Sequence, residues 1–218
     1  MSQLLELLAR NKMTLIVALP ENNLELAEAA SKGGADALLL AGDLSADKKN
    51  MKAIVSRLKV PVGIDQNRAE HFKKTEVEAM AGLGFDFIDI NFENFSGEIV
   101  KLKKIAKVLS LNSRFFLDDL VEIEGAGLNA LDAAIVPQSG QGKELVVGDL
   151  QNYISIILSA GLPVIIPTQR SIRPSEVAII ADTGAKGILL TPVVTGTSAK
   201  HIEKNTREFR VAIDDLGE

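Results

Sequence analysis

The chain has 218 residues, of which 46% are hydrophobic and 24% charged, so it can bury a continuous core and is not a disordered chain. It contains no cysteine, which excludes a disulfide scaffold, a thiolate nucleophile and a cysteine-ligated metal, and makes the cytoplasm the expected compartment. A net charge of −5 without a basic run gives no phosphate-neutralising face, so we expect no nucleic-acid partner.

Two apolar segments are considered as membrane elements, and neither fits. Residues 1–12 hold four leucines but also Glu6 and Arg10, and they predict a short amphipathic helix rather than a signal peptide. Residues 150–169 carry no charged residue, yet Pro163 and Pro167 interrupt them, and a proline inside a helix costs about 3 kcal/mol. We therefore expect a helix, a turn and a buried strand there, and no membrane association.

Eight short apolar runs recur along the chain, each of them apolar on both faces, as a parallel strand covered on both sides would be. They are residues 14–19, 37–41, 60–64, 85–90, 114–117, 133–136, 163–166 and 187–190. Segments with helical periodicity separate them, among them residues 98–109 and 147–160. This alternation predicts an α/β fold, one (β/α)8 TIM barrel over residues 1–218, with an open doubly wound sheet as the alternative.

A three-residue motif precedes every second predicted strand. Its copies are Gly34-Ala35-Asp36, Gly84-Phe85-Asp86, Ala130-Leu131-Asp132 and Gly184-Ala185-Lys186. Glycine suits the left-handed residue that ends a helix, and the polar residue then faces water where the strand begins. Because ligand sites of such barrels lie at the carboxyl ends of the strands, we expect Asp36, Asp86 and Asp132 to be structural.

Polar residues stand where the predicted strands end: Glu21, Asp43, Asp65, Gln66, Asp89, Asn91, Asp118, Asp119, Gln138, Thr168, Gln169, Arg170 and Thr191. Clustered carboxylates raise one another's pKa, which suits a general acid or base, and they can also hold a hard cation such as Mg²⁺. We take Asp65, Asp89 and Asp118 as the candidate catalytic residues. The alternative is that they pair with basic side chains or accept loop hydrogen bonds, and whether a metal is bound stays open.

The number of histidines and the positions of the lysines argue against several kinds of catalytic site. Only His71 and His201 are available, which is little material for a histidine metal site or a Ser-His-Asp triad. No lysine ends a predicted strand, so Schiff-base chemistry of the class I aldolase kind is not expected. Lys143 is the lysine best placed to reach the end of the barrel where the strands end.

Two glycine-containing loops are candidate anion or substrate sites. After the last strand, Gly196, Thr197 and Ser198 run into the final helix, and with Arg170 they are the candidate phosphate-binding residues, although Thr197 or Ser198 could simply cap that helix. After the sixth strand, Gln138, Ser139, Gly140 and Lys143 form a candidate substrate loop that could fold over a ligand. Its spacing is not that of a P-loop.

Stretches along most of the chain, these loops included, resemble those of the phosphate-binding barrels, and among them the N-acetylmannosamine-6-phosphate 2-epimerases. The matching stretches are Leu15-Ile16-Val17, Gly33-Gly34-Ala35, Phe116-Leu117-Asp118-Asp119, residues 121–125, Ser139-Gly140, residues 163–166 with Arg170 and Pro174, residues 195–198, His201-Ile202 and Phe209. The resemblance implies a barrel enzyme that acts on a phosphorylated sugar.

The chain departs from that pattern at two strand ends. Such epimerases carry a lysine after strand three and a glutamate after strand seven, where this chain has Ile64-Asp65-Gln66 and residues 167–170. The leading hypothesis is therefore an enzyme that acts on a small phosphorylated metabolite, such as a sugar phosphate, by acid–base proton transfer (epimerase or isomerase) or by reversible C–C cleavage (lyase). The alternative is a non-catalytic barrel that binds a metabolite or protein partner. No flavin or haem signature is present, and we expect a homo-oligomer that associates through the helices flanking the barrel.

Overall fold

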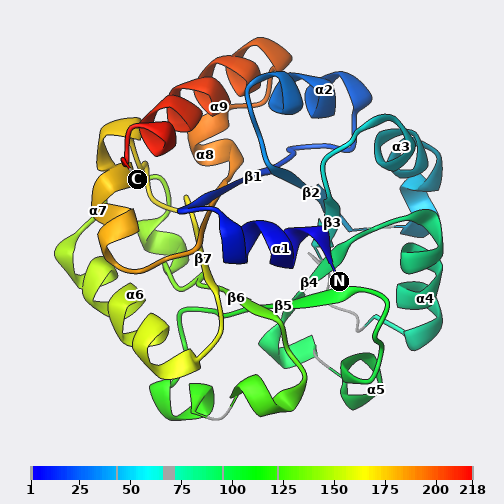
Figure 1. Ribbon diagram of the computed structural model, residues 1–218, viewed down its shortest axis with the longest axis horizontal. Coiled ribbons are helices and arrows are strands. Elements are labelled where there is room, and N and C mark those ends of the chain that lie inside the picture. The colour runs from blue at the N-terminus through cyan, green and yellow to red at the C-terminus, as the bar shows by residue number, and fades with distance from the viewer. Residues whose placement is uncertain (1, 43, 66–71, 95, 122, 218) are drawn as a thin grey trace.

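The computed structural model describes residues 2–42, 44–65, 72–94, 96–121 and 123–217, and its eight parallel strands close into a barrel (Figure 1). The strands are β1 (Thr14–Ala18), β2 (Ala37–Ala41), β3 (Val62–Asp65), β4 (Phe87–Asn91), β5 (Ala106–Ser110), β6 (Ala130–Asp132), β7 (Val164–Pro167) and β8 (Gly187–Leu190). Each strand pairs with the next, and β8 returns to pair with β1. The predicted single-domain (β/α)8 barrel is confirmed.

Helices surround the strands as predicted. They are α1 (Gln3–Arg10), α2 (Leu24–Lys32), α3 (Leu44–Arg57), α4 (Lys74–Leu83), α5 (Gly97–Val100), α6 (Val147–Ala160), α7 (Val177–Asp182), α8 (Pro192–Thr195) and α9 (Ala199–Asp214). Short 3₁₀ turns complete the loops, namely η1 (Phe92–Asn94), η2 (Leu117–Leu120), η3 (Ile123–Ala126), η4 (Gln138–Gly140) and η5 (Pro174–Glu176). None of the helices in the described ranges has the length and apolar character of a membrane span.

Two apolar cores follow from the alternation of side chains along each strand. The outer core lies between the sheet and the helices. The inner core fills the barrel and includes Ile16, Phe87 and Ile165. Here Gly63 on β3 is required, because a Cβ at this position would lie 2.2–2.5 Å from three ring atoms of Phe87. The Phe87 ring thus takes space that any side chain on residue 63 would need.

Helix α1 closes the end of the barrel where the strands begin, and Figure 1 shows it lying across that opening. Leu4 and Leu8, one turn apart on the helix, are buried in the inner core, as expected for the predicted amphipathic helix. The carboxylate of Asp86 holds the start of the helix: it accepts hydrogen bonds from Ser2 Oγ at 2.6 Å and from the backbone amides of Gln3 and Leu4 at 2.8 Å. Asp86 is thereby structural, as its position before β4 suggested.

The predicted position of the fifth strand is wrong. Residues 106–110 form β5, whereas the sequence pattern placed them at the end of a helix and assigned the strand to residues 114–117. The lysines at 101, 104 and 107 are spaced like one face of a solvated helix, but only Gly97–Val100 is helical here. Lys107 is instead buried on β5, and its Nζ donates hydrogen bonds to the carbonyls of Val100 and Leu102. The ammonium group therefore satisfies backbone oxygens where α5 ends.

The predicted sixth strand lies three residues too late, and the repeat motif explains why. Gly34, Gly84 and Gly184 have φ angles of 97°, 97° and 93°, as their place in the motif requires. Before β6, the glycine with a positive φ (79°) is Gly127, so the motif there is Gly127-Leu128-Asn129 and not residues 130–132. Accordingly, Asn129 Oδ1 accepts the amide of Lys107 on the preceding strand, just as Asp36 Oδ2 accepts the amide of Leu15. This shift moves Asp132 from the beginning of a strand to its end.

Candidate functional site

Three aspartates lie inside the barrel towards the carboxyl ends of the strands. Asp65 ends β3, Asp89 is paired with it in register on β4, and Asp132 ends β6. The residue two positions before Asp89 is Phe87 and the one two before Asp132 is Ala130, and both belong to the inner core, so the alternation of the strands directs these carboxyl groups inward as well. Asp89 and Asp132 are only 3% and 5% exposed. We refer to Asp65, Asp89 and Asp132 as the interior carboxylate cluster.

Burial raises the pKa of every member of the cluster, and neighbouring charges add to the rise for Asp89 and Asp132. Burial raises the pKa of Asp65 from the usual 3.8 to about 6. The pKa of Asp89 is raised well above its usual range, first by burial, then by the charges of Asp132 and Asp65. Burial also raises the pKa of Asp132 to about 7, although hydrogen bonds from Asp89 and from the Ser110 hydroxyl oppose that rise. A hydrogen bond with Asp132 raises the pKa of Asp89 further, so the pair favours a proton on Asp89.

Two oxygens of the cluster have no hydrogen-bond partner within the described part of the chain: Oδ1 of Asp89 and Oδ1 of Asp132. A buried polar oxygen without a partner costs about 1–3 kcal/mol, so native proteins rarely keep one without a reason. Buried carboxyl groups with a raised pKa and an unpartnered oxygen are typical of acid–base sites, so these two oxygens are candidate partners of a ligand.

Asp118 is not part of the cluster. The prediction that it ends the fifth strand is wrong, because β5 ends at Ser110 and Asp118 lies exposed on η2. Asp132 was missed because the repeat motif placed it at a strand entry, and Ser110 was missed because residues 106–110 were assigned to a helix. The signal available for both was a polar residue that closes a short apolar run, Ala106-Lys107-Val108-Leu109-Ser110 and Ala130-Leu131-Asp132.

Arg170, after β7, is held inside the protein. Its Nε and Nη2 donate to the two oxygens of Asp149 on α6 at 2.7 and 3.1 Å, and its Nη1 donates to the carbonyl of Gly140 at 2.8 Å. The bidentate, largely buried ion pair and the bond to Gly140 together engage all three guanidinium nitrogens. Arg170 thus fixes the loop after β6 against α6.

The predicted substrate loop runs through η4 and is held by its neighbours. Besides the contact between Arg170 and Gly140, the amide of Gly142 donates to the carbonyl of Gln169, and the amide of Ser171 donates to the carbonyl of Lys143. Gly140 is required here because a Cβ would lie 2.8 Å from Nη1 of Arg170. Gln138, Ser139 and Lys143 are exposed on this loop.

The predicted phosphate-binding residues lie where α9 begins. Gly196 has a φ of 71°, Thr197 is exposed, and Ser198 is the N-cap of the 16-residue helix. The Ser198 hydroxyl accepts the amide of His201 at 3.4 Å and lies 3.0 Å from His201 Nδ1. The capping alternative raised from the sequence is therefore realised for Ser198. Capping and anion binding use the same groups, so this geometry does not decide between them.

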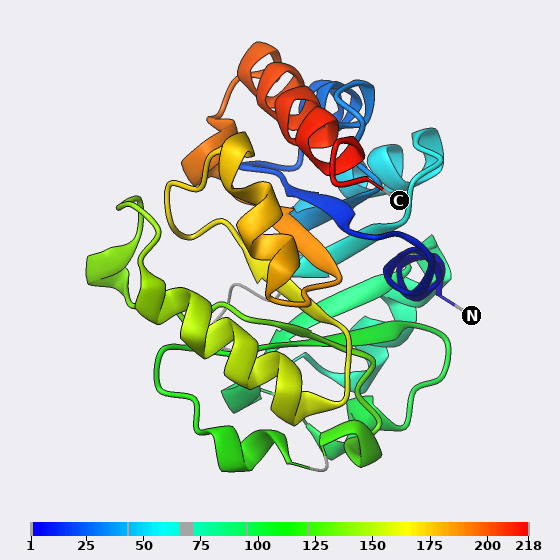
Figure 2. The same ribbon diagram turned by 60° about the vertical axis from the view of Figure 1, so that its left-hand side comes forward.

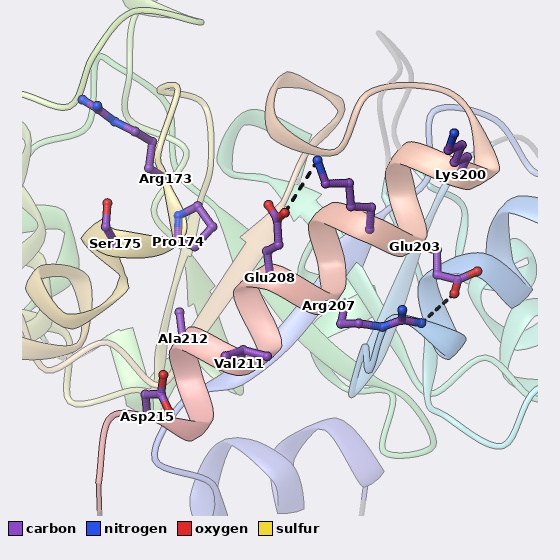
Figure 3. Close-up of a pocket in the computed structure, with 11 residues that line it drawn as sticks. Arg173, Pro174, Ser175, Lys200, Glu203, Arg207, Glu208, Val211, Ala212 and Asp215 are labelled. Carbon is purple, nitrogen blue, oxygen red and sulfur yellow. Dashed lines mark hydrogen bonds and ion pairs between the residues drawn. The ribbon is translucent and has the colours of Figure 1, made fainter.

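A cavity of about 1030 Å³ lies outside the barrel between η5 and α9 (Figure 3). Four of its charged side chains pair with one another: Lys204 contacts Glu208 at 3.7 Å and Arg207 contacts Glu203 at 2.6 Å. Figure 3 shows these side chains along the outer face of α9. The cavity thus lies on the outer surface, away from the interior carboxylate cluster.

Four of the residues considered from the sequence, Asp43, Gln66, His71 and Glu122, lie outside the described residues. Among the residues that the structure does describe, no group of three or more histidine, aspartate or glutamate side chains is arranged to hold a metal ion. The possibility of Mg²⁺ raised from the sequence therefore gains no support from a defined ligand set.

The fold has well-defined relatives among solved structures. A thiamine phosphate pyrophosphorylase from Pyrococcus furiosus is similar, with a TM-score of 0.71 and 20% identity over 96% of this chain and 100% of the other. The N-acetylmannosamine-6-phosphate 2-epimerase from Clostridium perfringens gives a TM-score of 0.63 and 18% identity over 98% and 96%. A phosphoribosyl anthranilate isomerase from Thermus thermophilus gives 0.67 and 17% over 94% and 100%.

In sequence the chain stands apart. It matches no protein-family model, and no curated protein matches it. At these identities the structural likeness establishes the fold. The chain is thus a TIM barrel with the fold of enzymes named for phosphorylated metabolites, and the loose resemblance to N-acetylmannosamine-6-phosphate 2-epimerases noted in the sequence extends to the whole barrel.

Proposed function

We propose that this protein is an enzyme that transfers protons on a small phosphorylated metabolite, as an epimerase or isomerase, or in a reversible C–C cleavage. The observation that carries the proposal is the interior carboxylate cluster, in which burial raises the pKa of the carboxyl groups and two oxygens lack a hydrogen-bond partner. The similar solved structures support it, because several are named as enzymes of phosphorylated compounds. Their low identity leaves the reaction itself to be tested.

The cluster provides both a base and an acid. Asp65, with a pKa of about 6, is mostly ionised at pH 7 and can accept a proton from a carbon beside a carbonyl group. The pKa of Asp89 is raised by burial and then by the charges of Asp132 and Asp65, so Asp89 is suited to donate a proton to the carbonyl oxygen as the enediol forms. Return of the proton to the other carbon or the other face would complete an isomerisation or epimerisation. Because the groups are coupled, the pH profile reports the cluster as a whole.

We assign phosphate binding to Gly196, Thr197 and Ser198, where backbone amides and hydroxyl groups meet the positive end of the α9 dipole. An anion there would compete with the contacts between Ser198 and His201. Arg170 is assigned a different role, that of a residue that positions Gly140 and the exposed Gln138, Ser139 and Lys143.

Turnover of a panel of sugar phosphates and related phosphorylated carbonyl compounds tests the proposal. We expect Asp89→Asn to lower kcat/KM for the active compound by about 10²–10⁴-fold, the usual contribution of an acid–base group. Asp182→Asn, at the exposed end of α7, is the matched control and should leave kcat/KM unchanged. Unchanged activity in Asp89→Asn would contradict the proposal, and no turnover across the panel would favour the non-catalytic alternative.

We also propose that the protein self-associates through α6. Figure 2 shows this helix along the outer surface of the barrel. Val147 and Leu158 on α6 are 70% and 81% exposed, and the only charged residue of the helix, Asp149, is buried. An uncharged face can pack against its own copy without like-charge repulsion. Sedimentation analysis should show a dimer or larger assembly that Leu158→Glu dissociates, whereas a monomeric wild-type protein would exclude this association.

A further inference from the structure

A second cavity, of about 220 Å³, lies at the carboxyl ends of β4 and β5. Its apolar walls come from Leu111, Phe115, Phe116 and Leu120, in the segment between β5 and η3. A drug-sized ligand occupies about 300–1,000 Å³, so a space of this volume suits one part of a ligand, of one or two rings.

The apolar side chains at this cavity are not all used for the core. Leu111 and Leu120 are buried, whereas Phe116 is 71% exposed. Leaving a phenylalanine in water forgoes about 1.5–3 kcal/mol of burial, and apolar side chains that line a hollow are the usual signature of a binding site. An aromatic ring in the cavity would cover Phe116 and gain ring contacts worth about 0.5–1.5 kcal/mol.

The charges at the rim exclude an anionic ligand group. Glu93 and Arg114 form an ion pair of 3.0 Å, which leaves Asp119 as the uncompensated charge among the lining residues. A phosphate or carboxylate here would meet a net negative rim, while an uncharged ring would not. A phosphate group of the ligand would therefore bind elsewhere at the carboxyl ends of the strands.

The cavity and the interior carboxylate cluster share a stretch of backbone. The amide of Leu111, a wall residue, donates to the carbonyl of Asp132 at 2.8 Å, and the preceding residue, Ser110, contributes a hydrogen bond to the Asp132 carboxylate. Leu111 and Leu120 pack in the outer core, so the cavity lies on the helix side of the sheet, one residue along β5 from the side chain that contacts the cluster.

We propose that this cavity is a subsite for an uncharged aromatic ring. That the ring is part of the substrate, which would then be a phosphorylated metabolite carrying an aromatic group, rests on the proposed function; ring binding itself does not. The subsite distinguishes such a substrate from a plain sugar phosphate, which has no group to cover Phe116.

Binding of indole, followed by NMR on protein with ¹³C-labelled leucine methyl groups, tests the proposal without turnover. We expect saturable ring-current shifts at the methyl groups of Leu111 and Leu120, and none with benzoate at equal concentration. Phe116→Ala should weaken indole binding by up to about tenfold, whereas Ile179→Ala, which removes an exposed apolar side chain on α7, should not.

The reciprocal variant tests the charge argument. In Asp119→Lys we expect benzoate to bind and indole affinity to stay within about twofold, because only the rim charge changes. Indole that leaves Leu111 and Leu120 unshifted, or benzoate that binds the wild-type protein as well as indole does, would overturn the subsite. Asp89→Asn should bind indole normally, so loss of turnover with retained ring binding separates failure of the proposed function from failure of the subsite.

Discussion

The two ends of the barrel use the same residue type in opposite ways. Where the strands begin, Asp86 accepts three hydrogen bonds from the start of α1, and Asp36 accepts the amide of Leu15 and the Arg210 guanidinium at 3.0 Å. Where the strands end, Asp89 and Asp132 each keep one oxygen that no described group contacts. The first pair stabilises the fold, whereas the fold leaves one oxygen of each residue in the second pair without a hydrogen bond.

This difference predicts opposite signs for the same kind of substitution. Removing a carboxylate that satisfies backbone amides leaves those amides unpaired and lowers the free energy of unfolding. Removing a buried carboxylate that the fold does not satisfy relieves a desolvation penalty and raises it. Stability and activity should therefore separate along the barrel axis, as is common where active sites carry strain.

The largest stability effect should come from pH acting on the cluster. The pKa of Asp132 is about 7 in the folded protein against 3.8 as its ordinary value, so between about pH 4 and pH 7 the folded state binds more protons than the unfolded state. By linkage, this group makes the free energy of unfolding fall as pH rises through that window, by up to about 1.4 kcal/mol per pH unit. Below about pH 4 this loss of stability from the buried carboxylate is absent, and above about pH 7 it stays constant.

Asp132→Asn should remove that penalty. In urea unfolding, we expect the variant to exceed the wild-type protein by roughly 2 kcal/mol or more at pH 8 and to differ little at pH 4, because the uncharged amide mimics the protonated carboxyl group. A variant that is less stable than the wild-type protein at both pH values would show instead that the ionised carboxylate supports the fold.

A smaller effect of opposite sign is expected at the other end of the barrel. Asp86→Ala removes the acceptor for three hydrogen bonds at the start of α1 and should lower the free energy of unfolding by about 1–2 kcal/mol, with faster amide hydrogen exchange in Gln3 and Leu4. Asp182→Ala, at an exposed position, provides the comparison. Unchanged exchange at both amides would mean that α1 is held without Asp86.

The sequence pattern was sufficient for the barrel because six of its strands are apolar runs bounded by glycine, proline or polar residues. It failed where tertiary contacts decide: Lys107 is accepted on a buried strand only because carbonyls of Val100 and Leu102 surround its ammonium group. Asp132 was missed for a different reason, because the repeat motif placed it at the start of the sixth strand, whereas Asp65 and Asp89 were found because their strands were assigned within one or two residues.

The role of Arg170 could not be predicted for a related reason. Its partners, Asp149 and the carbonyl of Gly140, lie 21 and 30 residues away in the chain, and nothing local in the sequence records that they meet. An arginine that follows a barrel strand has the composition of an anion site whether it binds a ligand or an internal carboxylate.

A pH titration of ¹³C-labelled aspartate carboxyl groups by NMR tests the central claim most directly. The account predicts apparent pKa values of about 6 and about 7 for two carboxyl resonances, with the latter lost in Asp132→Asn and the former shifted in it. If every aspartate resonance instead titrated near the ordinary value of 3.8, the carboxylates inside the barrel would share no proton at neutral pH, and the acid–base assignment would be contradicted.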